Sequence, residues 1–347
     1  MILSIDFGGA VAKVLIVREK DFEVVEVPLG FRTRPRLTVS ETLRYIIKQA
    51  VGDKKPEAIY ASGEIASVEL KEILTKPPLD PVEALEKLEL PIVVVGAGII
   101  CVNGTAVRGV EIEDYAEDIA RWLPFEVKIS EIQNYFANKK LYPQIIPTTE
   151  REIRLEQAAA RVRIRSTLNA QHSTLNTDYV IASGGVFSKA PTVSCVVLTL
   201  LDALQPEGLF KVFLDRKQML PALAALASYN EEEAQKILDQ DPFAFLGAVF
   251  SVPEGAFFQV DLGLAEPQEL EVSLGELVVF PLDTGKTAKV RFETKSQKGE
   301  FEAEGGPAGL VIDARGRPLE LPRGENERIR VLQEWEESIC FAPLFKK

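Results

Sequence analysis

Short apolar runs alternate with stretches of helical spacing in the first hundred residues. The apolar runs predict strands at residues 1–27 (a hairpin pair), 57–61 and 92–107 (two strands). One helix is predicted between the capping box Thr38-Val-Ser-Glu41 and Gly52, and another at 79–88. Strands that alternate with helices in this way indicate an α/β layer fold.

The middle of the chain is predicted to be mainly helical before strands return. One helix covers 114–123, and the capping box Thr149-Glu-Arg-Glu152 leads a long helix. Five arginines are assigned to its solvated side, with a basic docking face as the alternative: Arg151, Arg154, Arg161, Arg163 and Arg165. The following elements are predicted at 179–182 (strand), 191–204 (helix), 210–214 (strand), 216–227 (helix) and 231–239 (helix capped by Asn230).

The pattern loses its helical period from Phe257 to Ile312. Six short strands are predicted there, at 257–261, 270–274, 277–281, 288–293, 299–303 and 309–313. They indicate a small β-barrel or sandwich. A last helix is predicted at 326–341, and its apolar stripe of Ile329, Leu332, Trp335 and Ile339 is expected to pack in the core rather than against a partner.

These patterns divide the chain into three predicted domains. Residues 1–250 form a core of two half-domains, which is divided near residue 92 and completed by 178–228. Residues 251–322 form the β-barrel or sandwich, and residues 323–347 the C-terminal helix and tail.

Composition excludes several classes of protein. The 347 residues carry a formal net charge of −12, which disfavours partners rich in phosphate, so neither nucleic acid nor a membrane surface is expected. Three cysteines without a close pair fit a reducing cytoplasm, and no apolar run is long enough for a membrane span. His172, the one histidine, stands in a polar run and is assigned to a solvated loop.

The segment Tyr179-Val-Ile-Ala-Ser-Gly-Gly-Val-Phe-Ser-Lys-Ala-Pro191 is the first candidate site. A strand leads to Gly184 and Gly185, where backbone can approach a ligand closely, and Pro191 suits the first turn of a helix. The N–H groups of such a helix favour an anion, so Ser183, Gly184, Gly185 and Ser188 are candidates for binding a nucleotide. A tight strand-to-helix turn without a ligand is the alternative.

The N-terminal hairpin is the second candidate site. Asp6 ends a strand, Gly8 and Gly9 form the turn, and Lys13 follows on the next strand. Asp6 can hold a hydrated Mg²⁺ through water, the glycines can present N–H groups to phosphate, and Lys13 can supply a charge. Alternatively, Asp6 accepts hydrogen bonds within the turn, and Lys13 faces solvent.

A weak repeat connects the two halves. Residues 5–10 can be aligned with 93–98, which places Gly96 in a second glycine hairpin but Val94 at the position of Asp6. The pattern Asp-x-Gly-x-x-x-x-Lys with a later Gly-Gly turn resembles the ATPase superfamily of actin, heat-shock chaperones and sugar kinases. This resemblance implies ATP or ADP with Mg²⁺ as ligand and an actin-like, duplicated ribonuclease-H-like core with a C-terminal all-β domain and terminal helix.

Four further blocks are more specific: Arg121-Trp-Leu-Pro-Phe-Glu126, Asn134–Pro143, Ile181–Ser188 and Leu310–Pro322. Together they resemble the MutL-type accessory proteins of glutamate mutase, over roughly residues 92–337. The resemblance implies that the chain protects or reactivates an adenosylcobalamin-dependent mutase. This chain is much shorter than the usual member and lacks the second aspartate.

Three functions follow from these observations. The first is a nucleotide-binding accessory protein that acts on the mutase subunit by conformational change, with weak ATPase activity at best. The second is a non-catalytic scaffold of the same fold, which Val94 favours. The third is a small-molecule kinase, which ranks lower because no aspartate follows the hairpin at 93–98. A homo-oligomer is possible in each case.

Overall fold

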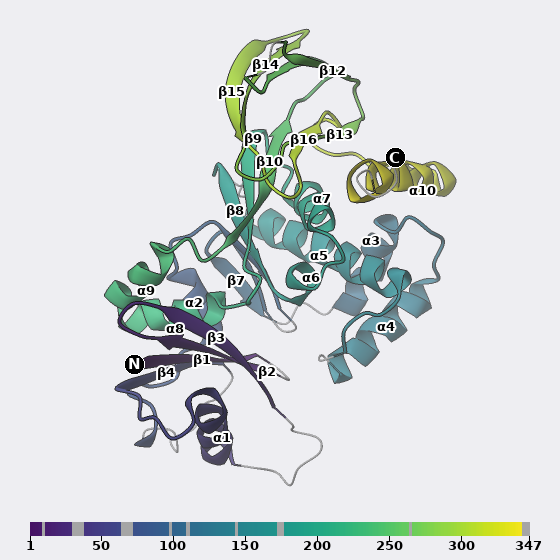
Figure 1. Ribbon diagram of the computed structural model, residues 1–347. Helices are drawn as coiled ribbons and strands as arrows, with labels where there is room; N and C mark the ends of the chain where they lie inside the picture. Colours follow the sequence, from purple (N-terminus) through teal and green to yellow (C-terminus); the bar gives the residue numbers. More distant parts are fainter. Residues whose placement is uncertain are drawn as a thin grey trace.

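The computed structural model describes residues 1–8, 11–29, 38–63, 72–96, 99–108, 112–142, 145–171, 177–263 and 266–341 (Figure 1). Their strands form three sheets, and helices separate the first two of them. No helix in these ranges is long and apolar enough to cross a membrane.

The first sheet has the order β3-β2-β1-β4. Its strands are β1 (Ile2–Gly8), β2 (Val11–Val17), β3 (Phe22–Pro28) and β4 (Ala58–Ser62). The predicted N-terminal hairpin is present and is extended by a third strand, β3. Helix α1 (Val39–Val51) packs on one face, and the expected capping box holds its N-terminus. Strand β4 runs parallel to β1, and this brings Ser62 beside Asp6.

The second sheet has the order β13-β16-β10-β9-β8-β5-β6-β7. Its strands are β5 (Ile92–Val95), β6 (Ile99–Val102), β7 (Thr105–Arg108), β8 (Tyr179–Ser183), β9 (Gly208–Leu214), β10 (Ala244–Ser251), β13 (Leu277–Phe280) and β16 (Leu310–Asp313). Residues 92–107 were expected to hold two strands. A third forms because Asn103 and Gly104 adopt positive φ, the backbone of a tight hairpin turn.

The two sheets repeat one topology. The order β7-β6-β5-β8 matches β3-β2-β1-β4, including the parallel pairing of the first and fourth strands. Helix α5 (Glu150–Gln171) precedes β8 as α1 precedes β4. The predicted duplicated α/β core is therefore confirmed, and the weak sequence repeat marks equivalent hairpins.

Different helices cover the two faces of the second sheet (Figure 1). Helices α5 and α7 (Val193–Leu204) pack with alternate strand residues such as Val93 and Ala182. Helices α2 (Pro81–Glu86), α8 (Leu220–Tyr229) and α9 (Glu231–Leu238) pack on the other face, with Val94 and Ile181. Helix α8 also contacts β1 and β4, so it lies between the two halves.

Two helix starts differ from the prediction. Gly184 is followed directly by the four-residue helix α6 (Gly185–Ser188), and α7 begins only at Val193. Thr192 caps α7, because its hydroxyl accepts a hydrogen bond from the N–H of Cys195 (3.3 Å). Pro191 therefore precedes the cap and does not occupy the first turn.

A helical segment joins β7 to α5. It contains the short 3₁₀ helix η2 (Ile112–Tyr115), α3 (Ala116–Arg121) and α4 (Ile129–Leu141). These elements pack on α5 around Ile119, Ile132, Phe136 and Leu155. At the equivalent place in the first half, residues 29–38 separate β3 from α1.

All six strands expected after residue 256 are present, but they belong to two sheets. Strands β11 (Ala256–Asp261), β12 (Gln268–Val272), β14 (Thr287–Thr294) and β15 (Lys298–Glu304) form the antiparallel third sheet. Strands β13 and β16 instead extend the second sheet, so the six do not form a single barrel or sandwich. The proposed domain boundaries stay a prediction.

The C-terminal helix α10 (Glu325–Glu336) continues into a π-helical turn at Glu337–Phe341. Leu332, Trp335 and Ile339 are buried and join the core of the second half. The expectation that this stripe packs in the core is confirmed.

The solvated arginine face predicted for α5 is wrong for three of its five arginines, since only Arg151 is exposed and Arg165 is half-buried. Arg154, Arg161 and Arg163 are each less than 10% exposed. They are buried because each has a polar partner that offsets the loss of hydration. Arg154 pairs with Glu336 at the end of α10 (2.7 Å), and Arg163 donates to the carbonyl oxygen of Gly96 (2.9 Å).

Arg161 belongs to a buried ionic network. Its Nε lies 2.7 Å from Asp202 Oδ2, and Asp202 Oδ1 lies 2.8 Å from Arg315 Nη1. Arg315 and Arg317 both pair with Asp313, at 2.9 and 2.7 Å. The backbone N–H of Arg315 also donates to Asp313 Oδ1. These arginines hold the pKa of Asp313 at about 2, although burial alone would raise it.

Candidate functional site

A polar row crosses the first sheet at the end of β1. Glu26, Lys13, Asp6 and Ser62 stand at opposing positions of β3, β2, β1 and β4. Opposed residues of neighbouring strands point to the same face of a sheet, so the four side chains form one line. Residues two positions back, Leu15 and Tyr60, pack with α8, so this face is turned towards the second half.

Asp6 is buried in this row. The hydroxyl of Ser62 donates to its Oδ1 (3.2 Å). Burial raises the pKa of Asp6 to about 6, while the Ser62 hydrogen bond and the charge of Lys13 act to lower it. Lys13 is also buried and its Nζ donates to Glu26, so it does not face solvent.

The equivalent row of the second sheet has lost its charges. Val94 takes the place of Asp6, Cys101 that of Lys13, and Ser183 that of Ser62. The duplication therefore retains one serine on each side. The sequence comparison correctly aligned Val94 with Asp6, because both pair in parallel with the serine of the fourth strand.

A carboxylate appears one strand further along. Asp215 follows β9 directly, and its Oδ2 accepts hydrogen bonds from the Ser183 hydroxyl (2.8 Å) and the Leu220 N–H (2.9 Å). Its Oδ1 is buried without a hydrogen-bond partner among the described residues. Burial raises the pKa of Asp215, and Lys13 of the first half acts against this rise.

The start of α8 connects both rows. The Ser62 hydroxyl lies 3.4 Å from the Pro221 carbonyl oxygen, and the Ser4 hydroxyl donates to Ala222 (2.7 Å). The preceding residue, Leu220, donates to Asp215. Movement of the halves against each other must therefore change contacts at this helix end.

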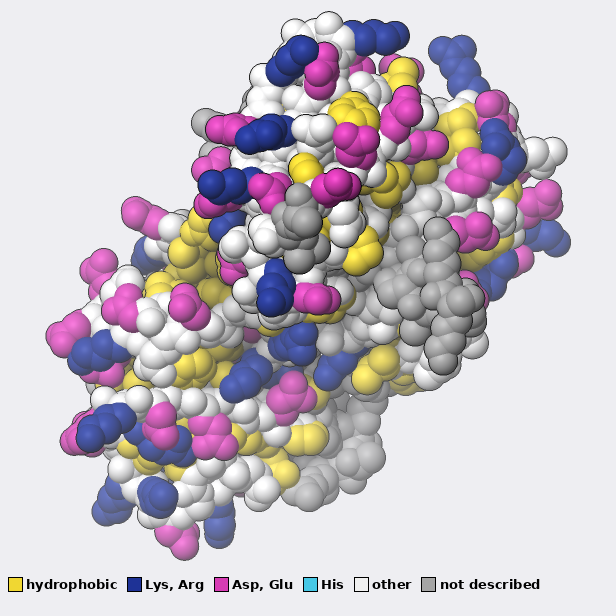
Figure 2. Space-filling view, turned by 45° about the horizontal axis from the view of Figure 1, so that its top comes forward, with side chains coloured by type: hydrophobic (Ala, Val, Ile, Leu, Met, Phe, Trp, Pro, Cys, Tyr) yellow, Lys and Arg dark blue, Asp and Glu magenta, His cyan; other side chains and the backbone are white. Residues whose placement is uncertain are grey.

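Further contacts join the halves around the rows. Lys189, just after α6, lowers the pKa of Glu26 through its charge, next to the larger effect of the hydrogen bond from Lys13. Lys217 lies 5.7 Å from the centre of the Phe22 ring, a cation–π contact. Figure 2 shows Lys and Arg side chains together in the middle of one face of the molecule.

One glycine follows the fourth strand of each half. Gly63 and Gly184 follow Ser62 and Ser183 and have φ of 131° and 109°. A Cβ on Gly184 would overlap the carbonyl of Val95, and one on Gly63 would lie 2.8 Å from Phe7 Cβ. Both glycines therefore allow the strand to pass close to the neighbouring hairpin. Gly185 is exposed, and nothing lies within 4 Å of its Cβ position, so it is open to a ligand.

The remaining candidates surround this region. Gly8 ends β1, and Gly9 lies outside the described residues, as does His172. Gly96 follows β5, and its carbonyl oxygen accepts a hydrogen bond from Arg163, whose pKa is lowered to about 10 by burial. Ser188 accepts a hydrogen bond from Gln218 Nε2 (2.6 Å), which ties α6 to the turn after Asp215.

Sequence reasoning missed Glu26, Ser62 and Asp215. One signal could have found Ser62: the tripeptide Ala-Ser-Gly occurs at 61–63 and again at 182–184. Glu26 and Asp215 carry no such signal, because pairing across strands brings them into the rows. No three acidic, histidine or cysteine side chains of the described residues come together as a metal site.

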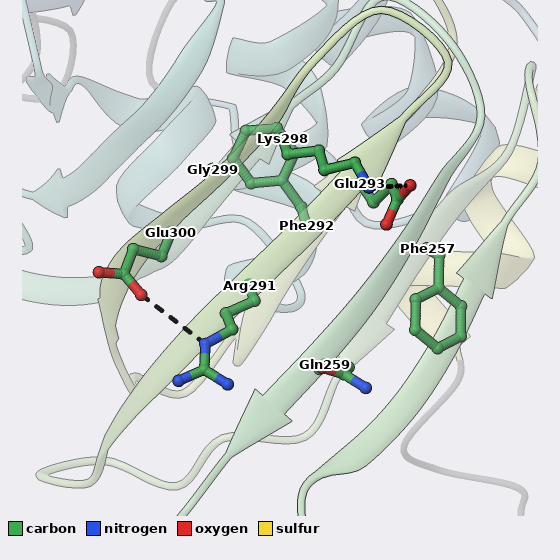
Figure 3. A pocket seen from close by; sticks show the side chains of 8 residues that line it. All are labelled: Phe257, Gln259, Arg291, Phe292, Glu293, Lys298, Gly299 and Glu300. Carbon is green, nitrogen blue, oxygen red and sulfur yellow. Dashed lines mark ion pairs between the residues drawn. The ribbon is translucent and has the colours of Figure 1, made fainter.

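A pocket of about 410 Å³ lies elsewhere, on the third sheet (Figure 3). Phe257, Arg291 and Lys298 are among its lining residues. Arg291 and Lys298 are paired with Glu300 (3.7 Å) and Glu293 (2.5 Å). Because these pairs are exposed and mutually neutralised, the pocket offers no free charge for a ligand.

The duplicated sheets, with α2 and α8 between them, define an actin-like fold. Residues 104–242 match the family model described as MutL protein, and this match covers less than half of the chain. It confirms, for these residues, the resemblance stated from the sequence. Three of the four blocks lie in this range, and the block at 310–322 lies outside it. No curated protein matches the chain significantly.

Solved structures give distant likenesses. Component A of (R)-2-hydroxyglutaryl-CoA dehydratase from Acidaminococcus fermentans is 16% identical, with a TM-score of 0.42 over 67% of this chain and 98% of that one. A ROK family protein from Streptococcus pneumoniae is 13% identical, with a TM-score of 0.33 over 69% and 99%. The PilM-PilN type IV pilus biogenesis complex is 14% identical, with a TM-score of 0.32 over 68% and 94%. At these scores the fold assignment rests on strand order and register.

Proposed function

We propose that the protein binds ATP or ADP with Mg²⁺ between its two halves and, by closing and opening, protects or reactivates an adenosylcobalamin-dependent mutase of the glutamate mutase type. The observation that carries this proposal is that the polar row of the first sheet and the pair Ser183 and Asp215 of the second half both contact the start of α8. Asp6 and Lys13 come from one half, and Ser183 and Asp215 come from the other. The MutL match supports the mutase as partner.

The residues at the rows fit a nucleotide with its cation. Asp6 would contact the cation through water, and the cation would neutralise charge on the phosphates. The ammonium of Lys13 can exchange Glu26 for a phosphate, and Gly185 leaves room for the nucleoside. Asp215 Oδ1, which has no hydrogen-bond partner among the described residues, can accept a proton donor that arrives when the halves move.

Closure would act through α8. A ligand that contacts both rows draws Ser62 and Asp215 together, and both are bonded to the first turn of this helix. A ligand can shift a conformational equilibrium only by the difference in its affinity for the two states. Contacts to both halves supply that difference, because they are complete only in the closed state.

A scaffold that has lost the nucleotide is the second candidate. Val94 favours it, since a buried apolar side chain stands where the second half would hold a carboxylate. The pairing of Lys13 with Glu26 favours it too. Both observations also indicate slow hydrolysis at best.

Calorimetry separates these two functions. Wild-type protein is titrated with ATP and ADP, with and without Mg²⁺, beside Asp6→Asn and the exposed control Asp261→Asn. We expect binding that is stronger with Mg²⁺, and loss of the Mg²⁺ effect in Asp6→Asn alone. Absence of binding by wild type under all conditions would establish the scaffold.

The mutase is tested separately. Purified glutamate mutase carrying hydroxocobalamin is mixed with the protein, ATP, Mg²⁺ and fresh adenosylcobalamin. Restored mutase activity that depends on the protein is the expected result. No complex and no recovery would reject the mutase as partner without affecting nucleotide binding.

A further inference from the structure

Arg163 of α5 is buried without an opposite charge beside it. The described residues include five buried arginines: Arg154, Arg161, Arg163, Arg315 and Arg328. Each of the other four forms an ion pair with a carboxylate, at distances from 2.7 to 3.7 Å. Arg163 is 6% exposed and forms no ion pair with a described residue. A buried charge without a counter-charge is costly, so this exception needs a physical reason.

Only part of the hydrogen-bonding capacity of Arg163 is used. Its Nη1 donates to the carbonyl oxygen of Gly96 (2.9 Å), whereas its Nε is buried and has no partner among the described residues. A neutral carbonyl oxygen accepts a hydrogen bond but does not neutralise the guanidinium. Burial lowers the pKa of Arg163 to about 10, so the side chain stays charged at neutral pH. The guanidinium therefore offers an uncompensated charge and an unused donor.

This side chain stands at the edge of the second sheet that favours ligands. Gly96 follows β5, and Gly184 follows the parallel strand β8, so both lie at carboxyl ends of strands. The two ends are close together, because a Cβ on Gly184 would overlap the carbonyl oxygen of Val95. Helix α5 contacts both β5 and α6, and α6 begins at the exposed Gly185. In open α/β sheets, ligands bind outside the carboxyl ends of the strands.

The charge of Arg163 replaces one that the second hairpin lacks. In the first half, Lys13 stands opposite Asp6 in the hairpin of β1 and β2. In the second half, Cys101 takes the place of this lysine. Arg163 instead reaches the second hairpin from α5, through its hydrogen bond to Gly96. Each half thus holds one buried cation at its own hairpin.

We propose that Arg163 binds a phosphoryl group of the nucleotide and that its Nε donates to a phosphate oxygen. The planar guanidinium suits this ligand, because its N–H groups match the spacing of two phosphate oxygens. The ligand supplies the negative charge that the described residues do not. This inference rests on the proposed function, and it divides the charge of the phosphates between Lys13 of one half and Arg163 of the other.

The stability of the ligand-free protein tests whether the charge serves the fold. Arg163→Met removes an uncompensated charge, so its midpoint of thermal unfolding should equal or exceed that of wild type. The matched control Arg161→Met removes a partner of the buried carboxylate of Asp202, so its midpoint should fall. A midpoint that falls as far in Arg163→Met as in the control would overturn the inference, because the bond to Gly96 would then be the reason for the arginine.

Calorimetry with ATP and Mg²⁺ tests the binding role. Arg163→Met should weaken the affinity about tenfold or more, the factor that corresponds to one lost hydrogen bond between charged groups. Arg163→Lys keeps the charge but has no guanidinium, so its affinity should lie between those of wild type and Arg163→Met. The affinity for adenosine, which has no phosphate, should be equal in the three proteins. Arg161→Met should bind ATP as wild type does.

The outcomes separate the inference from the proposed function. Equal ATP affinity in wild type, Arg163→Lys and Arg163→Met overturns the inference and leaves the proposed function standing. If wild type binds no nucleotide, the proposed function fails, and a titration with inorganic phosphate then decides the inference. Phosphate binding that is lost in Arg163→Met supports an anion site for free phosphate, whereas no phosphate binding by wild type overturns the site as well.

Discussion

The two glycines after β8 should respond in opposite ways to the same substitution. In Gly184→Ala, the new Cβ overlaps the Val95 carbonyl oxygen and lies 2.8 Å from its carbon, and φ is 109°. Backbone strain of this kind costs about 1–3 kcal/mol, and overpacking costs about 1–3 kcal/mol more. The free energy of unfolding should therefore fall by roughly 2–6 kcal/mol, a large part of the total for a typical domain.

Gly185→Ala should be nearly neutral or slightly stabilising, because its Cβ meets nothing within 4 Å and the residue begins a helix. The destabilisation by Gly63→Ala should lie between those of Gly184→Ala and Gly185→Ala. Its φ of 131° is also strained, but its Cβ meets the Phe7 side chain rather than a carbonyl. Urea unfolding followed by fluorescence measures the three values. Equal destabilisation by Gly184→Ala and Gly185→Ala would refute the argument. In the calorimetric titration, Gly185→Ala should weaken nucleotide binding while it leaves stability unchanged.

Three further predictions concern charge. Asp313 has a pKa of about 2 in the folded protein, against 3.8 for the free side chain, so it contributes roughly 2 kcal/mol of stability above pH 4 that is lost as the pH falls towards 2. Asp313→Asn should be less stable at neutral pH but lose less stability on acidification, as measured by urea unfolding at pH 5 to 2. Glu26→Gln should release Lys13 and raise the affinity for inorganic phosphate at low salt by at most about fivefold, measured by calorimetry; a loss of affinity contradicts the role of Lys13. Val94→Asp should raise slow phosphate release from ATP about tenfold or more, since a charge-assisted hydrogen bond contributes about 1.5–3 kcal/mol; brisk release by wild type would disprove the explanation.

Most elements of the fold could be predicted from the sequence because local patterns determine them. The capping boxes at Thr38 and Thr149 mark real helix starts, and the six C-terminal strands lie where the helical period is lost, with clear alternation along β14. The assignment of β13 and β16 to the second sheet could not be predicted in this way. Strand partners depend on packing at long range, here the antiparallel pairing of β13 with β16 and the parallel pairing of β16 with β10.

The arginines of α5 show a second limit. The sequence pattern assigned these arginines to the solvated side of the helix. Arg161 is nevertheless buried, because Asp202 of α7 lies 2.7 Å away and supplies the opposite charge. A sequence pattern does not show which charges from distant segments will meet, so buried ion pairs are invisible to it.

Some residues of the candidate site were predicted from the sequence, and others were missed. The difference between its two rows explains which residues were missed. Asp6 and Lys13 were found because they stand in one local motif, and Ser183 because a glycine follows it. Asp215 was missed because β9 has no counterpart in the first sheet, which ends at β4. In a protein whose halves derive from one pattern, the residue that replaces a lost charge need not stand at the equivalent position. The fifth strand of the second half places a carboxylate beside Ser183, where its Oδ1 and the ammonium of Lys13 come from opposite halves. The loss at Val94 is therefore compatible with a ligand that needs charge from both sides, while it removes the geometry that two equivalent aspartates would provide for rapid hydrolysis.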